Sequence, residues 1–434
     1  MNFRNLYNYL LLTAILMAVN PAGSKAYSVL AHEAIIDASW DKSILPLLKL
    51  KYPRAPADSL KKARSYAYGG SLIADMGYFP FGNPYFTNLV HYVRSGDFVT
   101  ALLVESQNLN EYAFALGALS HYMTDKYGHA LATNKAVPMV YPKMKQKFGN
   151  VVTYDDDNIS HKRMEFAFDV LQTARGNYVR QSYHDFIGFN VARPVLERAF
   201  IKTYGQDIND VFESLTLTIA SFRWSVKGLL PALTKTAWAI KSQDLIKTDP
   251  SLTSEKFHYH MKRQDYIKEF GSTREKPGLP AEVLSLIIRL VPKIGPARSL
   301  KFKDPGPEGE KLFVKGFDTT LFHYAEALNR LKQQKTVAFK DIDFDTGKIT
   351  EPGEYALADK TYSNLLIKLE DKKFKNLNES LKENILTFYR HKDTAENLRI
   401  PKRERIDWKK TNVALKELKI ANTTGYTKKV LTDQ

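Results

Sequence analysis

Two histidines and an aspartate recur at every fourth residue of the segment 121–129. If the segment is helical, each step of four residues rotates by about 40°, so His121, Asp125 and His129 form a slanted ladder on one face. Imidazole nitrogens and a carboxylate that can bridge two ions are suitable ligands for a divalent metal such as zinc. The alternative is a polar helix face with two hydrogen-bonded histidines, and the ladder alone does not separate the two interpretations.

Further residues of the metal-binding types lie nearby in the sequence. Five of the ten histidines fall between residues 27 and 165, each beside small or apolar residues. His161 and Glu165 form a second pair four residues apart, and Asp75 lies in an otherwise apolar stretch, where a buried carboxylate needs a partner. This concentration favours a metal site over a set of structural polar residues.

Helices must position these residues, because apolar residues recur at spacings of three and four along the chain. Helical segments are predicted to begin near Leu30, Ser59, Phe98, Glu111, His161, Ser182, Ile208 and Ser225. No glycine-rich phosphate loop and no strand–helix alternation is present, so the predicted fold class is all-α. Lysine and arginine become denser after about residue 245, which predicts a boundary there between a multi-helix domain over 27–245 and a basic, mainly helical C-terminal extension over 246–434.

The first residues have the pattern of an export signal. Arg4 is followed by the apolar run 10–19 and by a small-x-small sequence that ends at Ala26, so residues 1–26 are predicted to be a cleaved signal peptide. An apolar run of about ten residues is too short to cross a bilayer, which takes roughly 20. An uncleaved anchor is the alternative. The protein is therefore expected to be exported, to the periplasm or the medium.

The composition limits the chemistry further. The chain of 434 residues has no cysteine, which excludes disulfides and thiolate ligands. Any metal must be held by histidine, carboxylate and backbone groups. The net charge of +16 falls to +14 when Arg4 and Lys25 leave with the signal peptide, and it suits anionic substrates or surfaces, phospholipid and nucleic acid included.

Together, these residues resemble the zinc-dependent phospholipase C family, which shares its fold and three-zinc site with fungal single-strand-specific nucleases. The resemblance covers roughly residues 27–245. The positions that match the family's ligands in order and approximate spacing are Tyr27, His32, Asp75, His91, His121, Asp125, His129, His161 and Glu165. Two features depart from the pattern: Tyr27 replaces the usual tryptophan, and the gap from Asp125 to His129 is two residues shorter than in the secreted phospholipases.

The resemblance implies up to three Zn²⁺ ions. The implied ligand sets are Asp75, His91, His121 and Asp125 for the first ion, Tyr27 and His32 with Asp125 as a bridge for the second, and His129, His161 and Glu165 for the third. Tyr27 would bind through its terminal amine and backbone carbonyl, so this site would depend on removal of the signal peptide.

The implied function is an exported phospholipase C. Metal-activated water would cleave a phosphodiester, with Asp125 as the metal bridge and Asp75 orienting the water or accepting its proton. The products from a phospholipid would be diacylglycerol and a phosphorylated head group. A nuclease or nucleotidase on the same zinc site is one alternative, and a zinc-binding surface module without turnover is another. Glu165 and the absence of cysteine favour the phospholipase.

Two features of the C-terminal region complete the prediction. The segment 280–300 mixes aliphatic and basic residues, which is typical either of a core helix or of contact with a membrane surface. Asp341, Asp343 and Asp345 alternate as in a calcium loop, but Gly347 falls one place late for that motif. A solvated turn is therefore predicted there.

Overall fold

The computed structural model describes residues 29–178, 187–250, 252, 301–335, 337–390 and 406–423. Within these residues the chain is helical, and its β-structure is limited to one antiparallel bridge between Ile342 and Ile349. The predicted all-α class is confirmed. Among the same residues, no helix combines the length and apolar character that crossing a bilayer would need.

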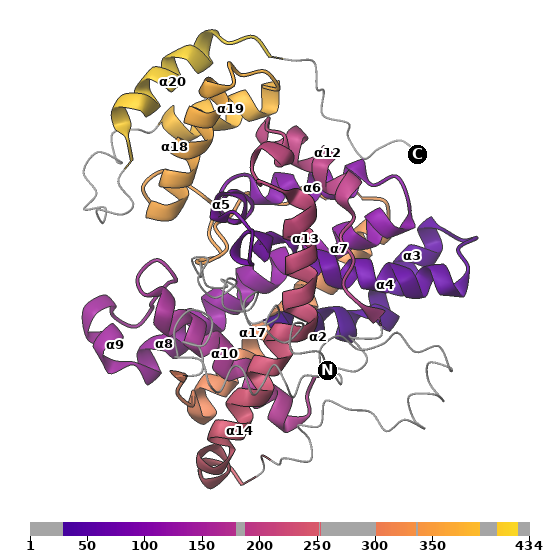
Figure 1. Ribbon diagram of the computed structural model, residues 1–434, viewed down its shortest axis with the longest axis vertical. Helices are drawn as coiled ribbons and strands as arrows, with labels where there is room; N and C mark the ends of the chain where they lie inside the picture. The colour runs from indigo at the N-terminus through magenta and orange to yellow at the C-terminus, as the bar shows by residue number, and fades with distance from the viewer. Residues whose placement is uncertain are drawn as a thin grey trace, which may run out of the picture.

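The helices vary in length from single turns such as η4 to the long helices α7, α14 and α17 (Figure 1). In chain order they are α2 (Val29–Ser39), η1 (Trp40–Ile44), α3 (Leu45–Lys51), α4 (Ala57–Ser71), η2 (Ile73–Tyr78), α5 (Pro84–Tyr92), α6 (Ser95–Glu105), α7 (Leu109–Gly128), η3 (His129–Thr133), α8 (Asn134–Val140), α9 (Pro142–Phe148), α10 (Asn158–Arg175), α12 (Arg193–Tyr204), η4 (Ile208–Asp210), α13 (Leu215–Trp224), η5 (Ser225–Leu229), α14 (Leu230–Thr248), α17 (Gly306–Lys332), α18 (Ala356–Asp371), α19 (Glu379–Phe388) and α20 (Trp408–Ile420).

Helix α7 runs through the middle of the fold, and almost all of its residues are buried. It crosses α4 at close range, because both helices present glycine at the crossing. A Cβ added at Gly70 would lie 2.0 Å from the carbonyl oxygen of Phe114, and one added at Gly117 would lie 2.1 Å from that of Ala67. The two backbones are therefore in direct contact, which fixes the position of α7 against α4 around Phe114 and Gly117.

The C-terminal region packs on the same core. Tyr324 of α17 donates a hydrogen bond of 2.9 Å to the carbonyl oxygen of Leu116 in α7, and its side chain is fully buried. Helices α18, α19 and α20 lie together beyond α5 (Figure 1). One large hydrophobic cluster includes side chains from both sides of residue 245. The predicted division into two domains near residue 245 stays a prediction.

Four predicted features lie outside the described residues: the signal peptide over 1–26, Tyr27, the start near Ser182 of a predicted helix, and the segment 280–300. The described chain begins at Val29, two positions after Tyr27, with the first turn of α2.

Candidate metal centre

The predicted ladder lies at the C-terminal end of α7. His121 and Asp125 belong to α7, and His129 starts the π-helical turn η3 while its N–H still bonds to the carbonyl oxygen of Asp125. Nε2 of His121 lies 3.0 Å from Oδ2 of Asp125, and Nε2 of His129 lies 3.8 Å from Oδ1. The carboxylate of Asp125 thus divides its two oxygens between the two histidines.

Two further histidines approach the same carboxylate from other helices. Nε2 of His32, on α2, lies 3.3 Å from Oδ1 of Asp125. Nε2 of His91, on α5, lies 3.4 Å from Oδ2 of Asp125 and 3.5 Å from Oδ1 of Asp75, which η2 supplies. Asp125 is therefore the centre of the cluster, with four imidazole rings around it.

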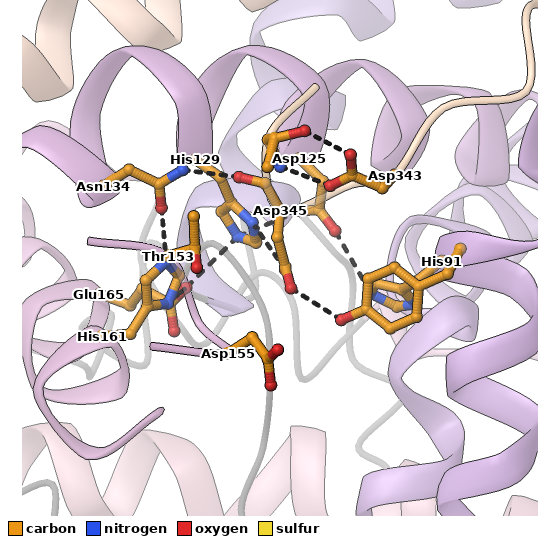
Figure 2. A network of polar contacts seen from close by, with 12 residues as sticks. His91, Asp125, His129, Asn134, Thr153, Asp155, His161, Glu165, Asp343 and Asp345 are labelled. Atoms are coloured by element: carbon orange, nitrogen blue, oxygen red, sulfur yellow. Dashed lines mark hydrogen bonds and ion pairs between the residues drawn. The ribbon is translucent and has the colours of Figure 1, made fainter. Parts of the chain in front are cut away.

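Helix α10 adds a third carboxylate group, that of Glu165. His161 and Glu165 lie one turn apart on α10, with Nδ1 of His161 3.0 Å from Oε1 of Glu165. The same oxygen lies 3.3 Å from Nε2 of His129 (Figure 2). His129 consequently connects the α7 part of the cluster with the α10 part.

Three groups of ligand atoms result, each compact enough for one ion. The groups are His32, His121 and Asp125; Asp75, His91 and His121; and His129, His161 and Glu165, and in each the ligand atoms lie within 4.8 Å of one another. All eight residues are buried. The structure thus brings together every predicted ligand except Tyr27, which lies outside the described residues.

Three of the rings are held in place through the nitrogen that faces away from the cluster. Nδ1 of His91 lies 2.9 Å from the carbonyl oxygen of Thr87, and Nδ1 of His121 lies 2.8 Å from that of Ser71. Nε2 of His161 lies 2.9 Å from Oδ1 of Asn134. An acceptor behind the ring fixes the tautomer and turns the other nitrogen toward the cluster, which is the usual arrangement of metal-binding histidines.

The sequence matches one protein family in the part that builds this cluster. Residues 31–214 match the family model described as zinc dependent phospholipase C. This part of the chain is similar to the zinc-dependent phospholipase C family. No curated protein and no solved structure matches the chain. The match includes all eight ligands that the structure brings together.

The cluster fits the zinc ions of the zinc-dependent phospholipase C family. Both oxygens of Asp75, both oxygens of Asp125 and Oε1 of Glu165 are buried and make no hydrogen bond to a described residue. A buried carboxylate without hydrogen bonds costs several kcal/mol unless a cation compensates it. Nitrogen and carboxylate ligands suit zinc, and three protein ligands leave a position open, as in catalytic zinc sites.

The pKa values of the cluster also indicate that its carboxylates are stabilised by a proton or a positive charge nearby. Burial raises the pKa of Asp75 well above its usual range. Burial acts in the same direction on Asp125, but the imidazoles of His121 and His129 outweigh it and hold the pKa of Asp125 well below its usual range. Burial lowers the pKa of His121, yet the charge of Asp125 prevails and raises it to about 9. A bound cation would replace the proton on this imidazole.

The grouping agrees with the implied ligand sets in two of three cases and refines the other. The set with His129 coincides with the third group, and the set with Asp75 contains the second group plus Asp125, whose Oδ2 lies 3.4 Å from Nε2 of His91. His32 was assigned to an ion with Tyr27 and Asp125. In the structure His32 lies against His121 as well, with the two rings stacked 4.3 Å apart.

Sequence reasoning missed two residues beside the cluster. The predicted solvated turn at 341–345 is wrong, because Asp343 and Asp345 are 0% and 1% exposed. Nδ1 of His129 lies 3.5 Å from Oδ1 of Asp345. Asn134 was also missed: it supports His161 and donates a 2.6 Å hydrogen bond to the carbonyl oxygen of Asp345 (Figure 2). The alternation of Asp341, Asp343 and Asp345 pointed to a metal-type loop, but the sequence was compared only with a calcium-binding motif.

Proposed function

We propose that the protein is a phospholipase C that hydrolyses the phosphodiester of a phospholipid at a centre of up to three zinc ions. The observation that supports this most is the sharing of ligands: His121 belongs to two of the ion-sized groups, and Asp125 lies between all three. Sharing keeps the ions close enough to act on one phosphate group, which separate structural sites would not require.

Zinc ions bound here would lower the pKa of a water molecule and neutralise the charge on the phosphate oxygens. The chain itself supplies the proton acceptor. Asp75 is buried beside the cluster and its two oxygens make no hydrogen bond to a described residue, so its carboxylate is placed to orient the water and take up its proton. The oxygen of the water would join phosphorus and the bond from phosphorus to the glycerol oxygen would break. The proton that Asp75 took from the water would pass to the glycerol oxygen, which leaves as a hydroxyl group.

The proposal includes export and activation by cleavage after Ala26. Two contacts on α2 support the activation step. His32 lies on the second turn of α2 with its ring in the cluster, and the N–H of Leu30 donates a 3.2 Å hydrogen bond to the buried carboxylate of Asp169 on α10. The start of α2 is therefore attached beside the cluster. A chain that began at Tyr27 would have its amino group only a few residues from His32, within reach of the same ions.

The test is a zinc-loaded protein that begins at Tyr27, incubated with vesicles of phosphatidylcholine, vesicles of phosphatidylinositol and single-stranded DNA. We expect release of diacylglycerol, its loss with a chelator and its return with zinc. DNA cleavage without lipid hydrolysis would establish the nuclease alternative instead. If three equivalents of zinc bind and neither substrate is cleaved, the enzyme hypothesis is refuted in favour of a non-catalytic zinc-binding module.

Two matched substitutions locate the chemistry. Asp75→Asn should reduce kcat by about 10²–10⁴-fold, since it removes a carboxylate that is both the proton acceptor and a ligand of one metal group but keeps the shape of the side chain. Asp318→Asn, an identical change at an exposed position of α17, should leave kcat unchanged. Retention of wild-type kcat by Asp75→Asn would remove Asp75 from the reaction.

A further inference from the structure

The segment 337–349 lies across the metal centre, although it follows the matched residues by more than a hundred positions. Hydrogen bonds attach its backbone to α7 and α5, which carry ligands, and to the neighbouring helices α6 and α8. They join Tyr122 Oη to Lys340 O (2.9 Å), Ser95 Oγ to Ile342 O (2.7 Å), Phe344 N to His91 O (3.2 Å) and Asn134 Nδ2 to Asp345 O (2.6 Å). These contacts place Asp345 at a defined position beside the cluster.

A glycine allows the segment to reach α7 so closely. Gly347 has a φ of +73°, a conformation that other residues rarely adopt. A Cβ at this position would also lie 2.5 Å from the carbonyl oxygen of Lys126 on α7. Both the turn and the close approach therefore require glycine, and the turn directs Asp345 toward His129.

The carboxylate of Asp345 connects to three side chains. Oδ1 lies 3.5 Å from Nδ1 of His129 (Figure 2). Oδ2 accepts hydrogen bonds from the hydroxyl groups of Tyr92, at 2.8 Å, and Tyr355. The two phenols donate to Oδ2, so Oδ1 remains directed at the imidazole. Asp345 is 1% exposed, which removes competition from bulk water.

The imidazole of His129 lies between this carboxylate and the cluster. Its Nε2 faces Glu165 and Asp125, at 3.3 and 3.8 Å, while its Nδ1 faces Asp345. The rings of His91 and His121 have neutral carbonyl oxygens in the corresponding position. A carboxylate behind a metal-binding imidazole fixes the tautomer and makes the ligand nitrogen more basic.

We propose that Asp345 is a positioning residue of the third metal group: it accepts the Nδ1–H of His129 and thereby directs Nε2 to the ion that His161 and Glu165 share. The C-terminal region is then part of the metal centre and not a separate extension. This inference rests on the zinc site of the proposed function but not on its substrate. The test therefore measures metal binding and the imidazole itself, not hydrolysis.

The experiment compares Asp345→Asn with Asp343→Asn in the full chain. Asp343 is a matched control, because it is a buried aspartate of the same loop whose carboxylate bonds to Thr346 within the turn. Competition with a chromophoric chelator gives the affinity of each zinc equivalent. Proton NMR of the zinc-loaded protein, assigned with His129→Asn, detects the Nδ1–H of His129.

We expect Asp345→Asn to weaken one zinc equivalent by about 10–100-fold, to leave the other equivalents unchanged and to move the Nδ1–H resonance of His129 upfield. Asp343→Asn should change neither. The proposal is overturned if Asp345→Asn binds every equivalent as the wild type does, if it weakens all equivalents together, or if Asp343→Asn causes the same loss, since each result assigns Asp345 a merely structural role.

Discussion

Gly117 lies where α7 crosses α4. We expect Gly117→Ala to displace the two helices and so to weaken metal binding without changing a ligand. The new Cβ would lie 2.1 Å from the carbonyl oxygen of Ala67, whereas real Cβ contacts are essentially never under 3.0 Å. The obstacle is backbone, so the helices must separate by about 1 Å. Overpacking of this kind costs about 1–3 kcal/mol, and the better helix propensity of alanine returns about 1 kcal/mol.

The same displacement should reach the ligands. Nδ1 of His121 lies 2.8 Å from the carbonyl oxygen of Ser71, and a shift of about 1 Å would stretch this contact beyond hydrogen-bonding range. Loss of such a support typically reduces metal affinity about 10–100-fold. Because His121 belongs to two of the three groups, we expect two zinc equivalents to weaken.

Chelator competition and urea denaturation of the metal-free protein measure both effects. Gly228→Ala is the matched control, because a Cβ at Gly228 meets nothing within 4 Å, and it should change neither zinc affinity nor stability by more than about 1 kcal/mol. If Gly117→Ala binds zinc as tightly as the wild type and unfolds at the same urea concentration, the argument that this crossing positions His121 is refuted.

Three further predictions follow from other parts of the structure. Removal of zinc with a chelator should lower Tm, since each site at a free zinc concentration of 100 Kd contributes about 2.7 kcal/mol; an unchanged Tm would contradict a metal centre in the core. Asn134→Leu should weaken one zinc equivalent by about 10–100-fold, because His161 loses its acceptor, and calorimetric titration with zinc would detect it. Burial raises the pKa of Asp359 to about 6 despite the hydrogen bond from the N–H of Gly353. The folded carboxyl thus keeps its proton above the unfolded pKa, so its contribution is full below about pH 4 and is lost as the pH rises through 6. Asp359→Asn should remove this loss, on the order of 2 kcal/mol, as measured by urea denaturation at pH 4 and pH 7, and a parallel pH dependence in both proteins would contradict it.

Much of the centre could be predicted because several of its candidate ligands lie four residues apart on one helix. His121 and Asp125, or His161 and Glu165, lie one turn apart, so the spacing in the sequence already implies proximity in space. The apolar surroundings of Asp75 and His91 likewise predicted burial. The sequence did not show which side chains would share an ion. The contact of His32 with both His121 and Asp125 depends on how α2 packs against α7.

The C-terminal loop shows what local reasoning could not reach. Asp343 and Asp345 form a charged, glycine-containing pattern that is typical of a solvated turn. In the structure the loop is buried instead, because backbone hydrogen bonds to Ser95, His91 and Asn134 compensate its polar groups. These partners are more than two hundred residues away in the chain, and no periodicity connects them.

The sequence by itself determined the helical class, the residue types of a candidate metal centre and eight candidate ligands that meet in the structure, since helix periodicity and burial are local properties. It also matched the family over residues 31–214. Only the tertiary structure decided that Asp125 lies among four imidazoles, that His121 is shared, and that Asp345 stands behind His129. Those relations depend on the packing of helices and of a distant loop on α7, where contact is set by side-chain volume, glycine crossings and the pairing of buried polar groups.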